Sequence, residues 1–291
     1  MIYSMTGYGR AEQTIADKTF LVEVRSLNGK QFDLRLTLPA LLKPYEFEVR
    51  NLLNEQLERG SVECIIYLKQ NGAAKPVSIN TDLAKGYFQP MAQLAKELGI
   101  ETDNILSTLL KLPEVIAPVT DVLSEEDYKQ FESILREAIG HLSKHRTEEG
   151  KVLEADLLDR IKHIEEQQVT VANLEPLRRT RIKEGLVKVL EDNVGKENYD
   201  PNRLEQELIY YIEKIDISEE QVRLTNHCNY FRDILKGKEK SKGKKLSFIL
   251  QEIGREINTT GSKAYDSQIQ QSVVIMKDEL EKAKEQVLNV L

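Results

Sequence analysis

The polar side of one predicted helix, over residues 246–263, carries the residue types most able to do chemistry. Apolar residues at positions 246, 250, 253 and 257 recur at helical spacing, which predicts one buried stripe. The other side mixes charged and polar groups at spacings of three and four: Gln251, Glu252, Arg255, Glu256, Asn258 and Thr259. Side chains at these spacings meet on a helix surface. Such a face can hold a divalent metal ion or bind a phosphate, and we expect Gly261 to cap the helix.

A second group of candidate ligands lies on a helix predicted to begin at Ser218. Glu220, Arg223 and His227 share one face of this helix, and Asp216 comes just before it. Carboxylates with one imidazole suit Mn²⁺ better than Ca²⁺. The spacing alone favours a simpler interpretation, in which both helices carry ordinary ion pairs on exposed faces. Metal binding becomes a serious alternative because either face can complete the ligand set of the other.

Basic residues gather in two short segments. Residues 236–245 contain six lysines and join the two candidate helices. Such a run is usually a solvated linker, but beside a carboxylate site it can steer a phosphate backbone. Residues 178–183 contain four more basic side chains, which we interpret as surface groups.

Composition excludes several classes of protein. The chain has 48 acidic and 41 basic residues and a net charge of -7, so a site for a polyanion must be a local basic patch. Cys64 and Cys228 flank no motif, which argues against a disulfide scaffold or a zinc site. The chain has no P-loop, dinucleotide fingerprint or Gly-x-Ser-x-Gly elbow. No segment is apolar enough for a membrane span or a secretory leader, which predicts a cytoplasmic protein without a membrane partner.

The first 70 residues predict an antiparallel sheet with one packed helix. Residues 19–25 and 32–38 alternate apolar and polar side chains, and Asn28-Gly29 between them is a strong hairpin signal. Residues 41–57 predict a helix that ends before Gly60, and residues 62–68 predict a further strand.

From residue 82 onward the pattern is mostly helical. Residues 125–145 and 148–173 predict two long helices, and Pro176 separates them from another helix that begins at Arg178. We expect Ser218 to cap its helix, with Gln221 reaching back and Ile217 packing on Val222. The last helix, from Asp266, has apolar residues at alternating steps of four and three, which predicts a seam for a partner helix in this chain or another subunit.

Short segments near both ends of the chain resemble the bacterial YicC/YloC-like proteins, a family described as metal-dependent endoribonucleases. The N-terminal segments are residues 4–10, residues 23–28 and Arg59-Gly60, and the C-terminal segments are residues 216–227 and 245–263. The chain departs from the family pattern at Lys30, Gly254 and Ile257, and residues 71–200 match weakly. The resemblance predicts an α+β protein with an N-terminal α+β domain at 1–155, a long helical connector at 156–206 and a C-terminal helical domain at 207–291.

The resemblance also implies a function and a site. The expected activity is endonucleolytic hydrolysis of single-stranded or structured RNA with a divalent metal, Mn²⁺ ahead of Mg²⁺, by a homo-oligomer that we expect to be a hexamer. The expected catalytic residues are Glu252, Glu256, Arg255 and His227. The expected metal ligands are Asp216, Glu220, His227, Glu252 and Glu256. The expected RNA contacts are Arg10, Arg25, Arg223, Lys244, Lys245, Asn258 and Lys263.

Two alternatives from other classes remain open. The protein could be a non-catalytic RNA-binding adaptor that presents RNA to another nuclease, with its polar faces forming interfacial salt bridges. It could also be a structural assembly protein with negligible affinity for RNA. The sequence does not divide the catalytic roles among the carboxylates and His227.

Overall fold

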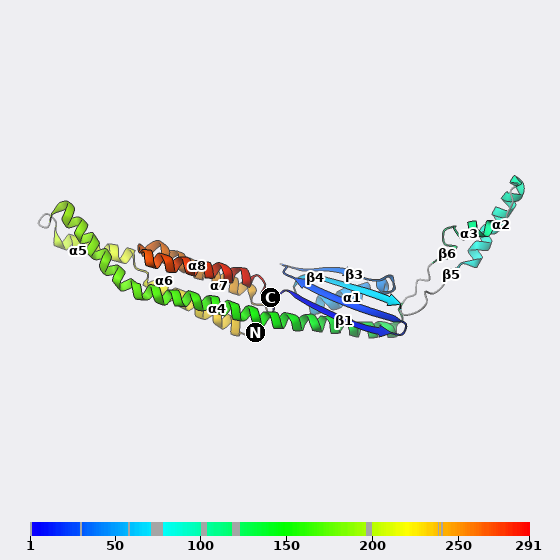
Figure 1. Cartoon of the computed structure of the whole chain (residues 1–291), viewed down its shortest axis with the longest axis horizontal. Helices are drawn as coiled ribbons and strands as arrows, with labels where there is room; N and C mark the ends of the chain where they lie inside the picture. Colours follow the sequence, from blue (N-terminus) through cyan, green and yellow to red (C-terminus); the bar gives the residue numbers. More distant parts are fainter. Residues whose placement is uncertain are drawn as a thin grey trace.

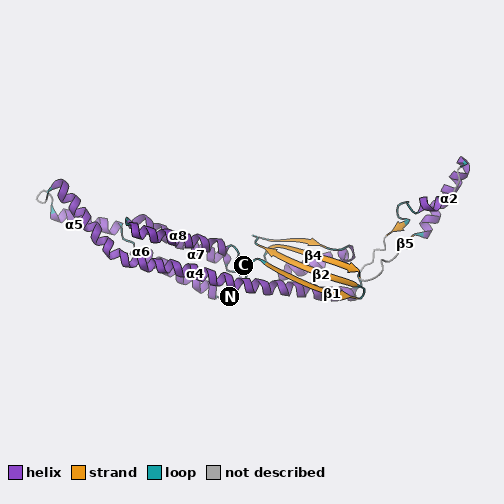
Figure 2. Ribbon diagram, in the orientation of Figure 1, coloured by secondary structure: helices purple, strands orange, loops and turns teal. Residues whose placement is uncertain are grey.

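The computed structural model describes residues 2–29, 31–57, 59–70, 78–99, 104–117, 123–195, 200–237, 239 and 241–291. The predicted α+β class is confirmed. A four-stranded sheet lies along the first part of one very long helix, and a helical bundle lies along a later part of the same helix (Figure 1 and Figure 2).

The sheet has the order β1-β2-β4-β3 and is mixed. Its strands are β1 (Gly7–Ile15), β2 (Lys18–Leu27), β3 (Phe32–Thr37) and β4 (Gly60–Gln70). β2 pairs antiparallel with both β1 and β4, whereas β3 pairs parallel with β4. The predicted hairpin at Asn28-Gly29 is therefore wrong, because β2 and β3 are not neighbours. The Asn28 amide instead donates to the carbonyl of Leu288 at 2.6 Å.

Helices cover one face of the sheet. The predicted helix over 41–57 is confirmed as a short 3-10 helix, η1 (Ala40–Tyr45), that continues into α1 (Glu46–Gln56). Alternate β2 side chains such as Phe20 and Val22 pack with residues of α1 and the start of α4 in one apolar core. The other face of the sheet carries exposed side chains that include Tyr8, Arg25 and Tyr67.

One helix, α4 (Glu125–Val194), runs unbroken for 70 residues. The predicted separate helices and the break at Pro176 are wrong, because Pro176 lies inside α4. An internal proline removes one helical hydrogen bond and crowds the preceding turn. Contacts on both sides hold the helix through this point: Val171 is fully buried in the bundle core, and Arg178 is bonded to two other elements.

The bundle consists of α6 (Ser218–Lys236), α7 (Gly243–Ala264) and α8 (Ser267–Val287) packed on α4, and α5 (Pro201–Lys214) precedes it. The seam of α8 is buried inside this bundle against α4 and α7, so its partner helices belong to the same chain. The seam residues are Ile269, Val273, Met276, Leu280, Ala283 and Val287. Gly254 lets α8 approach, since a Cβ there would lie 2.9 Å from Leu280 Cδ2.

Two predicted helix ends are wrong. The Ser218 side chain does not cap α6; Asp216 accepts from the Ser218 N–H at 3.0 Å, and Val222 is exposed rather than packed on Ile217. The α7 helix continues past Gly261 to Ala264, where Tyr265 adopts a positive φ of 44°. The negative charge of a carboxylate is favourable at the start of a helix, which explains why Asp216, and not the Ser218 hydroxyl, accepts the hydrogen bond from the first N–H group of α6.

A small lobe lies between β4 and α4 in the sequence. It contains β5 (Ser78–Ile79), α2 (Thr81–Leu98), α3 (Ile105–Leu109) and β6 (Ile116–Ala117), and β5 pairs antiparallel with β6. In the part of the chain that the structure describes, no helix has the length and apolar character to cross a membrane.

The two ends of the chain meet beside the middle of α4, in a region that we call the joint (Figure 1). The joint comprises residues 3–6, Ser26, Arg146 and residues 288–291. Its strands are tied by a bridge between Ser4 and Val290 and by the Leu291 N–H, which donates to the Tyr3 carbonyl at 2.9 Å. The N-terminal segments that resemble the family thus build a contact between the sheet and the bundle.

Candidate functional site

The first turn of α6 meets the last turn of α7 beside α4, and we call this meeting point the junction. The two helices are consecutive and antiparallel, so the start of one lies next to the end of the other. The junction comprises Glu175, Arg178 and Arg179 of α4, Asp216 before α6, Glu220 and Gln221 of α6, and Thr260 and Lys263 of α7.

Glu220 and Lys263 form the central ion pair of the junction. Lys263 Nζ donates to Glu220 Oε1 at 2.8 Å and to the backbone carbonyl of Asp216 at 3.1 Å. Glu220 is only 4% exposed, and its second oxygen, Oε2, is buried without a partner. The carboxylate is therefore half satisfied in a site with little water.

Arg178 is the buried arginine of the junction. Its side chain is 1% exposed, and its guanidinium donates to the carbonyls of Lys263, Ala264 and Ile215 at 2.7 to 2.9 Å. It also donates to Glu175 Oε1 at 2.8 Å. The interpretation of residues 178–183 as surface groups is thus wrong for Arg178, which fixes the end of α7 against the start of α6. A cation at the last carbonyls of a helix also complements the helix dipole.

Arg179 holds Asp216 in its ionised form. Its guanidinium donates to Glu175 Oε1 at 2.9 Å and to Asp216 Oδ1 at 2.5 Å. Burial acts to raise the pKa of Asp216, but hydrogen bonds from Ser218 and the charge of Arg179 outweigh it and lower that pKa below its usual value. Asp216 therefore stays charged at neutral pH while it caps α6.

Unpaired buried atoms are concentrated at the junction. Among the described residues, five buried side-chain nitrogen or oxygen atoms lack a hydrogen-bond partner, and four belong here. They are Glu175 Oε2, Arg178 Nε, Glu220 Oε2 and Gln221 Oε1. Buried polar groups in folded proteins are nearly always paired, so these unpaired acceptor oxygens mark the junction as the candidate site.

The other candidate residues of α6 and α7 lie along the two helices, away from the junction. Glu256 is only 5% exposed, which corrects its expected place on a solvent-facing side, whereas Glu252, Arg255 and Asn258 are exposed. His227 lies seven residues after Glu220, and Glu256 lies seven before Lys263, so the antiparallel register puts them at the same level.

The expected metal ligands do not close around one point. Within the described residues, no group of three or more His, Cys, Asp or Glu side chains is arranged to hold a metal ion. No hydrogen bond or ion pair recorded for those residues joins His227 to Glu252 or Glu256. Arg223 pairs with Glu219 on the exposed face of α6. The structure thus brings together Asp216, Glu220 and Lys263, and it leaves the remaining candidates separate.

The lysine segment lies at the far end of α7 from the junction. Lys245 and Lys263 are 18 residues apart on this helix. At a rise of 1.5 Å per residue, this spacing corresponds to about 27 Å. Lys242 is buried and donates to the Leu235 carbonyl at 2.6 Å, Lys245 pairs with Glu239 at 2.5 Å, and Lys244 is exposed above the Phe248 ring.

Two members of the lysine segment, Lys238 and Lys240, and the departure at Lys30 lie outside the described residues. Arg10 and Arg25 lie on the open face of the sheet, where they pair with Glu12 and Glu23. Neither arginine therefore belongs to the junction.

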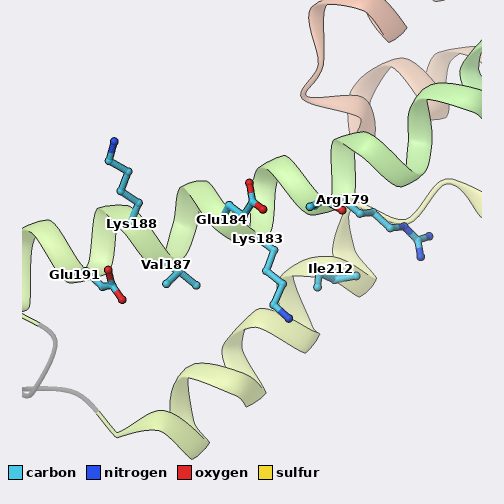
Figure 3. Close-up of a pocket in the computed structure, with 8 residues that line it drawn as sticks. Arg179, Lys183, Glu184, Val187, Lys188, Glu191 and Ile212 are labelled. Atoms are coloured by element: carbon cyan, nitrogen blue, oxygen red, sulfur yellow. The ribbon is translucent and has the colours of Figure 1, made fainter.

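An open groove adjoins the junction between the later part of α4 and α5 (Figure 3). Its volume is about 620 Å³, and its lining includes Arg179, Lys183 and Lys188 together with Glu184 and Glu191. Lys183 extends from α4 towards Ile212 of α5 (Figure 3). Arg179 belongs to both the groove and the junction, so the groove opens beside the ion pair between Arg179 and Asp216.

Sequence reasoning missed Glu175, Gln221 and the buried role of Arg178. A signal was present: Glu175 precedes Arg178 and Arg179 by three and four residues, the spacing of side-chain pairs on a helix. The break assigned to Pro176 removed Glu175 from the helix and hid this pairing.

Fold and site together define a class of protein: an N-terminal mixed sheet and a C-terminal helical bundle share one long helix, and a polar junction lies in the bundle. Comparison with known families gives the same division. The N-terminal region of the endoribonuclease YicC-like family matches residues 2–155, and its C-terminal region matches residues 170–291. The chain therefore belongs to the YicC-like endoribonuclease family.

Two relatives align over their whole length and over the whole of this chain. The probable endoribonuclease YicC of Clostridioides difficile is 32% identical over 299 residues. The probable endoribonuclease YicC of Haemophilus influenzae is 30% identical over 294 residues. The likeness thus extends over both the sheet and the bundle.

Proposed function

We propose that the protein is an endoribonuclease that cleaves phosphodiester bonds within single-stranded or structured RNA, and that the junction is its active site. Membership of an endoribonuclease family supports the activity. The cluster of three unpaired buried oxygens supports the location, and it is the observation that carries this proposal. Such oxygens are costly in a folded protein unless a cation or a donor completes them.

Glu220 and Lys263 supply two kinds of group that phosphodiester cleavage needs. Glu220 Oε2 is free to accept the proton of an attacking hydroxyl or water, because Lys263 holds only Oε1. The Lys263 ammonium would neutralise negative charge that builds up on the phosphate oxygens. Arg179, at the edge of the groove, already donates to Glu175 and Asp216, so it would contact a phosphate through its remaining N–H groups.

We also propose that a divalent metal ion takes part, with Mn²⁺ ahead of Mg²⁺. Among the described residues no three carboxylate or imidazole side chains converge, so the ion would have few protein ligands, and Glu175 Oε2 and Gln221 Oε1 are the candidates. Ions of this kind often bind one or two protein carboxylates and complete their coordination with water and substrate phosphates. Such an ion supplies Lewis-acid stabilisation of phosphate charge and a more acidic bound water.

The groove and the exposed face of α7 give RNA a path to the junction. The groove lining carries Lys183 and Lys188 beside Glu184 and Glu191, and the two lysines would contact the phosphates of the strand. Arg255 and Asn258 lie within about two turns of Lys263 on α7. There they would contact nucleotides next to the cleaved bond, and His227 and Glu256 would act on the same side as positioning groups.

We propose that the working protein is a homo-oligomer, with the hexamer implied by the family resemblance as the expected state. The buried seam of α8 lends no support to this proposal, but exposed apolar side chains remain on α6, α7 and α8. They include Val222, Tyr230, Phe248 and Val274. Light scattering should give a mass near six times the 33.4 kDa of one chain, and a single-chain mass would contradict the proposal.

Cleavage in the presence and absence of metal separates an enzyme from a non-catalytic adaptor. Several internally labelled RNAs are incubated with purified protein in EDTA and then with excess Mn²⁺. We expect no cleavage in EDTA and internal cuts after Mn²⁺ is added. An adaptor would bind the same RNAs in both conditions without cutting them. That result, from correctly folded protein and across several metals, would overturn the proposed activity.

A further inference from the structure

The joint is a second polar centre. Its unpaired buried atom is a hydrogen-bond donor, whereas those of the junction are mainly acceptors. A pocket of about 350 Å³ lies there beside the middle of α4, and its walls include Tyr3, Gln56, Ser143, Lys144 and Arg146. Counted along α4, Arg146 is 32 residues from Arg178. This spacing is about 48 Å in a helix, so the pocket is separate from the junction.

Arg146 is buried in this pocket without a negative partner. It is 5% exposed, and its Nη2 group donates to Ser26 and to the carbonyls of Met5 and Arg59. Its Nε is the fifth unpaired buried atom of the described residues, and no ion pair is recorded for this guanidinium there. Burial lowers the pKa of Arg146. A buried guanidinium without a carboxylate is costly, so an anion at this place would stabilise the fold.

The remaining lining supplies donors at the open side of the pocket. Lys144 and Ser143 are exposed at its edge, and Tyr3 contributes a phenol. Thr147 uses its hydroxyl to donate to the Ser143 carbonyl at 2.8 Å, so it supports the wall. Leu291 also lines the pocket, and its main-chain oxygen accepts from the N–H groups of Lys242 and Gly243.

We propose that this pocket binds a phosphate monoester, through the Arg146 guanidinium, the Lys144 ammonium and the Ser143 hydroxyl. A guanidinium with further N–H and O–H donors matches the several acceptor oxygens of such a group. The volume suits a ligand of nucleotide size. The phosphate belongs either to a free nucleotide or to the end of an RNA chain. Bound there, it would tie α4 to the strands of the joint.

Binding is tested on the full chain without metal, so that RNA cleavage plays no part in the readout. Thermal unfolding is followed in inorganic phosphate and in chloride of equal ionic strength. Calorimetric titrations follow with AMP, with adenosine, and with one short oligonucleotide carrying either a 5′-phosphate or a 5′-hydroxyl. We expect saturable stabilisation by phosphate, since a ligand that binds only the folded state raises the unfolding temperature.

The arms of this test distinguish the two sources of phosphate. Tight binding of AMP but not adenosine supports a nucleotide, and binding of the 5′-phosphorylated oligonucleotide alone supports an RNA end. No response to any phosphate beyond the chloride control overturns the proposal.

Variants of the exposed lining residues locate the site without disturbing the buried arginine. Lys144→Ala and Ser143→Ala should each weaken phosphate binding, Lys144→Ala by about tenfold. Lys151→Ala is the matched control, because Lys151 is exposed on the same helix and does not line the pocket. Unchanged affinity in the Lys144→Ala, Ser143→Ala double variant would place the anion elsewhere and overturn the proposal.

Discussion

The junction and the joint each contain a buried arginine of α4, but the two arginines differ in what surrounds them. Arg178 at the junction is bonded to Glu175 and to three carbonyls, and the unpaired groups around it are mainly acceptor oxygens. Arg146 at the joint bonds a hydroxyl and two carbonyls and has no carboxylate. The unpaired buried atoms of the junction are thus mainly acceptors, whereas the unpaired buried atom of the joint is the donor Arg146 Nε. One helix contributes an arginine to both places.

The largest expected difference between the junction and the joint is the loss of unfolding free energy when the arginine of each is replaced. Arg178→Met removes the donor of three carbonyls and one of the two donors of Glu175 Oε1, and it should destabilise the bundle by about 3–5 kcal/mol. Arg146→Met also removes an uncompensated charge, so its cost should be smaller, about 1–2 kcal/mol. Urea unfolding measures both. Equal losses for the two variants would mean that the partners of the two arginines are energetically equivalent.

Replacing each of two α7 glutamates by glutamine should show which of them contributes to the rate of RNA cleavage. Glu256 is buried one turn from Thr260, which contacts Gln221 of α6, whereas Glu252 is exposed. Glu256→Gln should therefore slow RNA cleavage by about tenfold or more if it positions the attacking group. Glu252→Gln should change activity less and leave stability within about 0.5 kcal/mol. Equal rate losses in single-turnover cleavage would contradict this division.

A pH effect should come from a third polar contact, between α4 and α8. Hydrogen bonds from Lys282, Arg160 and His163 outweigh burial and lower the pKa of Glu279 to about 2. Because the pKa is lower in the folded state than in the unfolded chain, this contact stabilises the fold at neutral pH. Its contribution is lost as the pH falls from the ordinary glutamate range towards 2. Glu279→Gln should flatten acid-induced unfolding in that window, and an unchanged profile would exclude this contact as the cause.

The smallest expected effect concerns the lysine segment. Lys242 is buried and belongs to the bundle, whereas Lys236, Lys244 and Lys245 are the exposed lysines among the described residues of the segment. Changing Lys244 and Lys245 to Ala should reduce the slope of log affinity against log salt by at most about 0.7 per lost phosphate contact. Turnover at saturating RNA should not change, because both lie at the far end of α7. An unaltered slope would show that Lys244 and Lys245 do not contact RNA phosphates.

Periodicity predicted most of the individual elements of this fold. The buried stripe of α7, the seam of α8 and the alternation of β2 follow directly from side-chain burial within one element. The β3 strand was also placed correctly, but its pairing with β4 was not predictable. Asn28-Gly29 satisfies the local rule for a hairpin, and the choice of partner depends on contacts between distant segments.

Much of the candidate site also could not be predicted from the sequence, because it depends on contacts between distant segments. The ion pair between Glu220 and Lys263 depends on the register of two helices, which the spacing within either helix does not reveal. The burial of Arg178 depends on α4 remaining helical past Pro176, and propensity argues against that. The sequence predicts the polar residues of α6 and α7 as one group of candidates, but only tertiary packing separates the buried Glu220 and Glu256 from the exposed Glu252.

The most direct test of the junction is the rate of RNA cleavage by Glu220→Gln compared with Glu219→Gln. The control makes the same chemical change one residue away, at an exposed carboxylate that pairs with Arg223. Single-turnover rates are measured in Mn²⁺, with circular dichroism to confirm folding. We expect Glu220→Gln to lose about 10²–10⁴ in rate and Glu219→Gln to remain near the unmodified protein. Equal rates for both variants, with the fold intact, would show that cleavage takes place elsewhere.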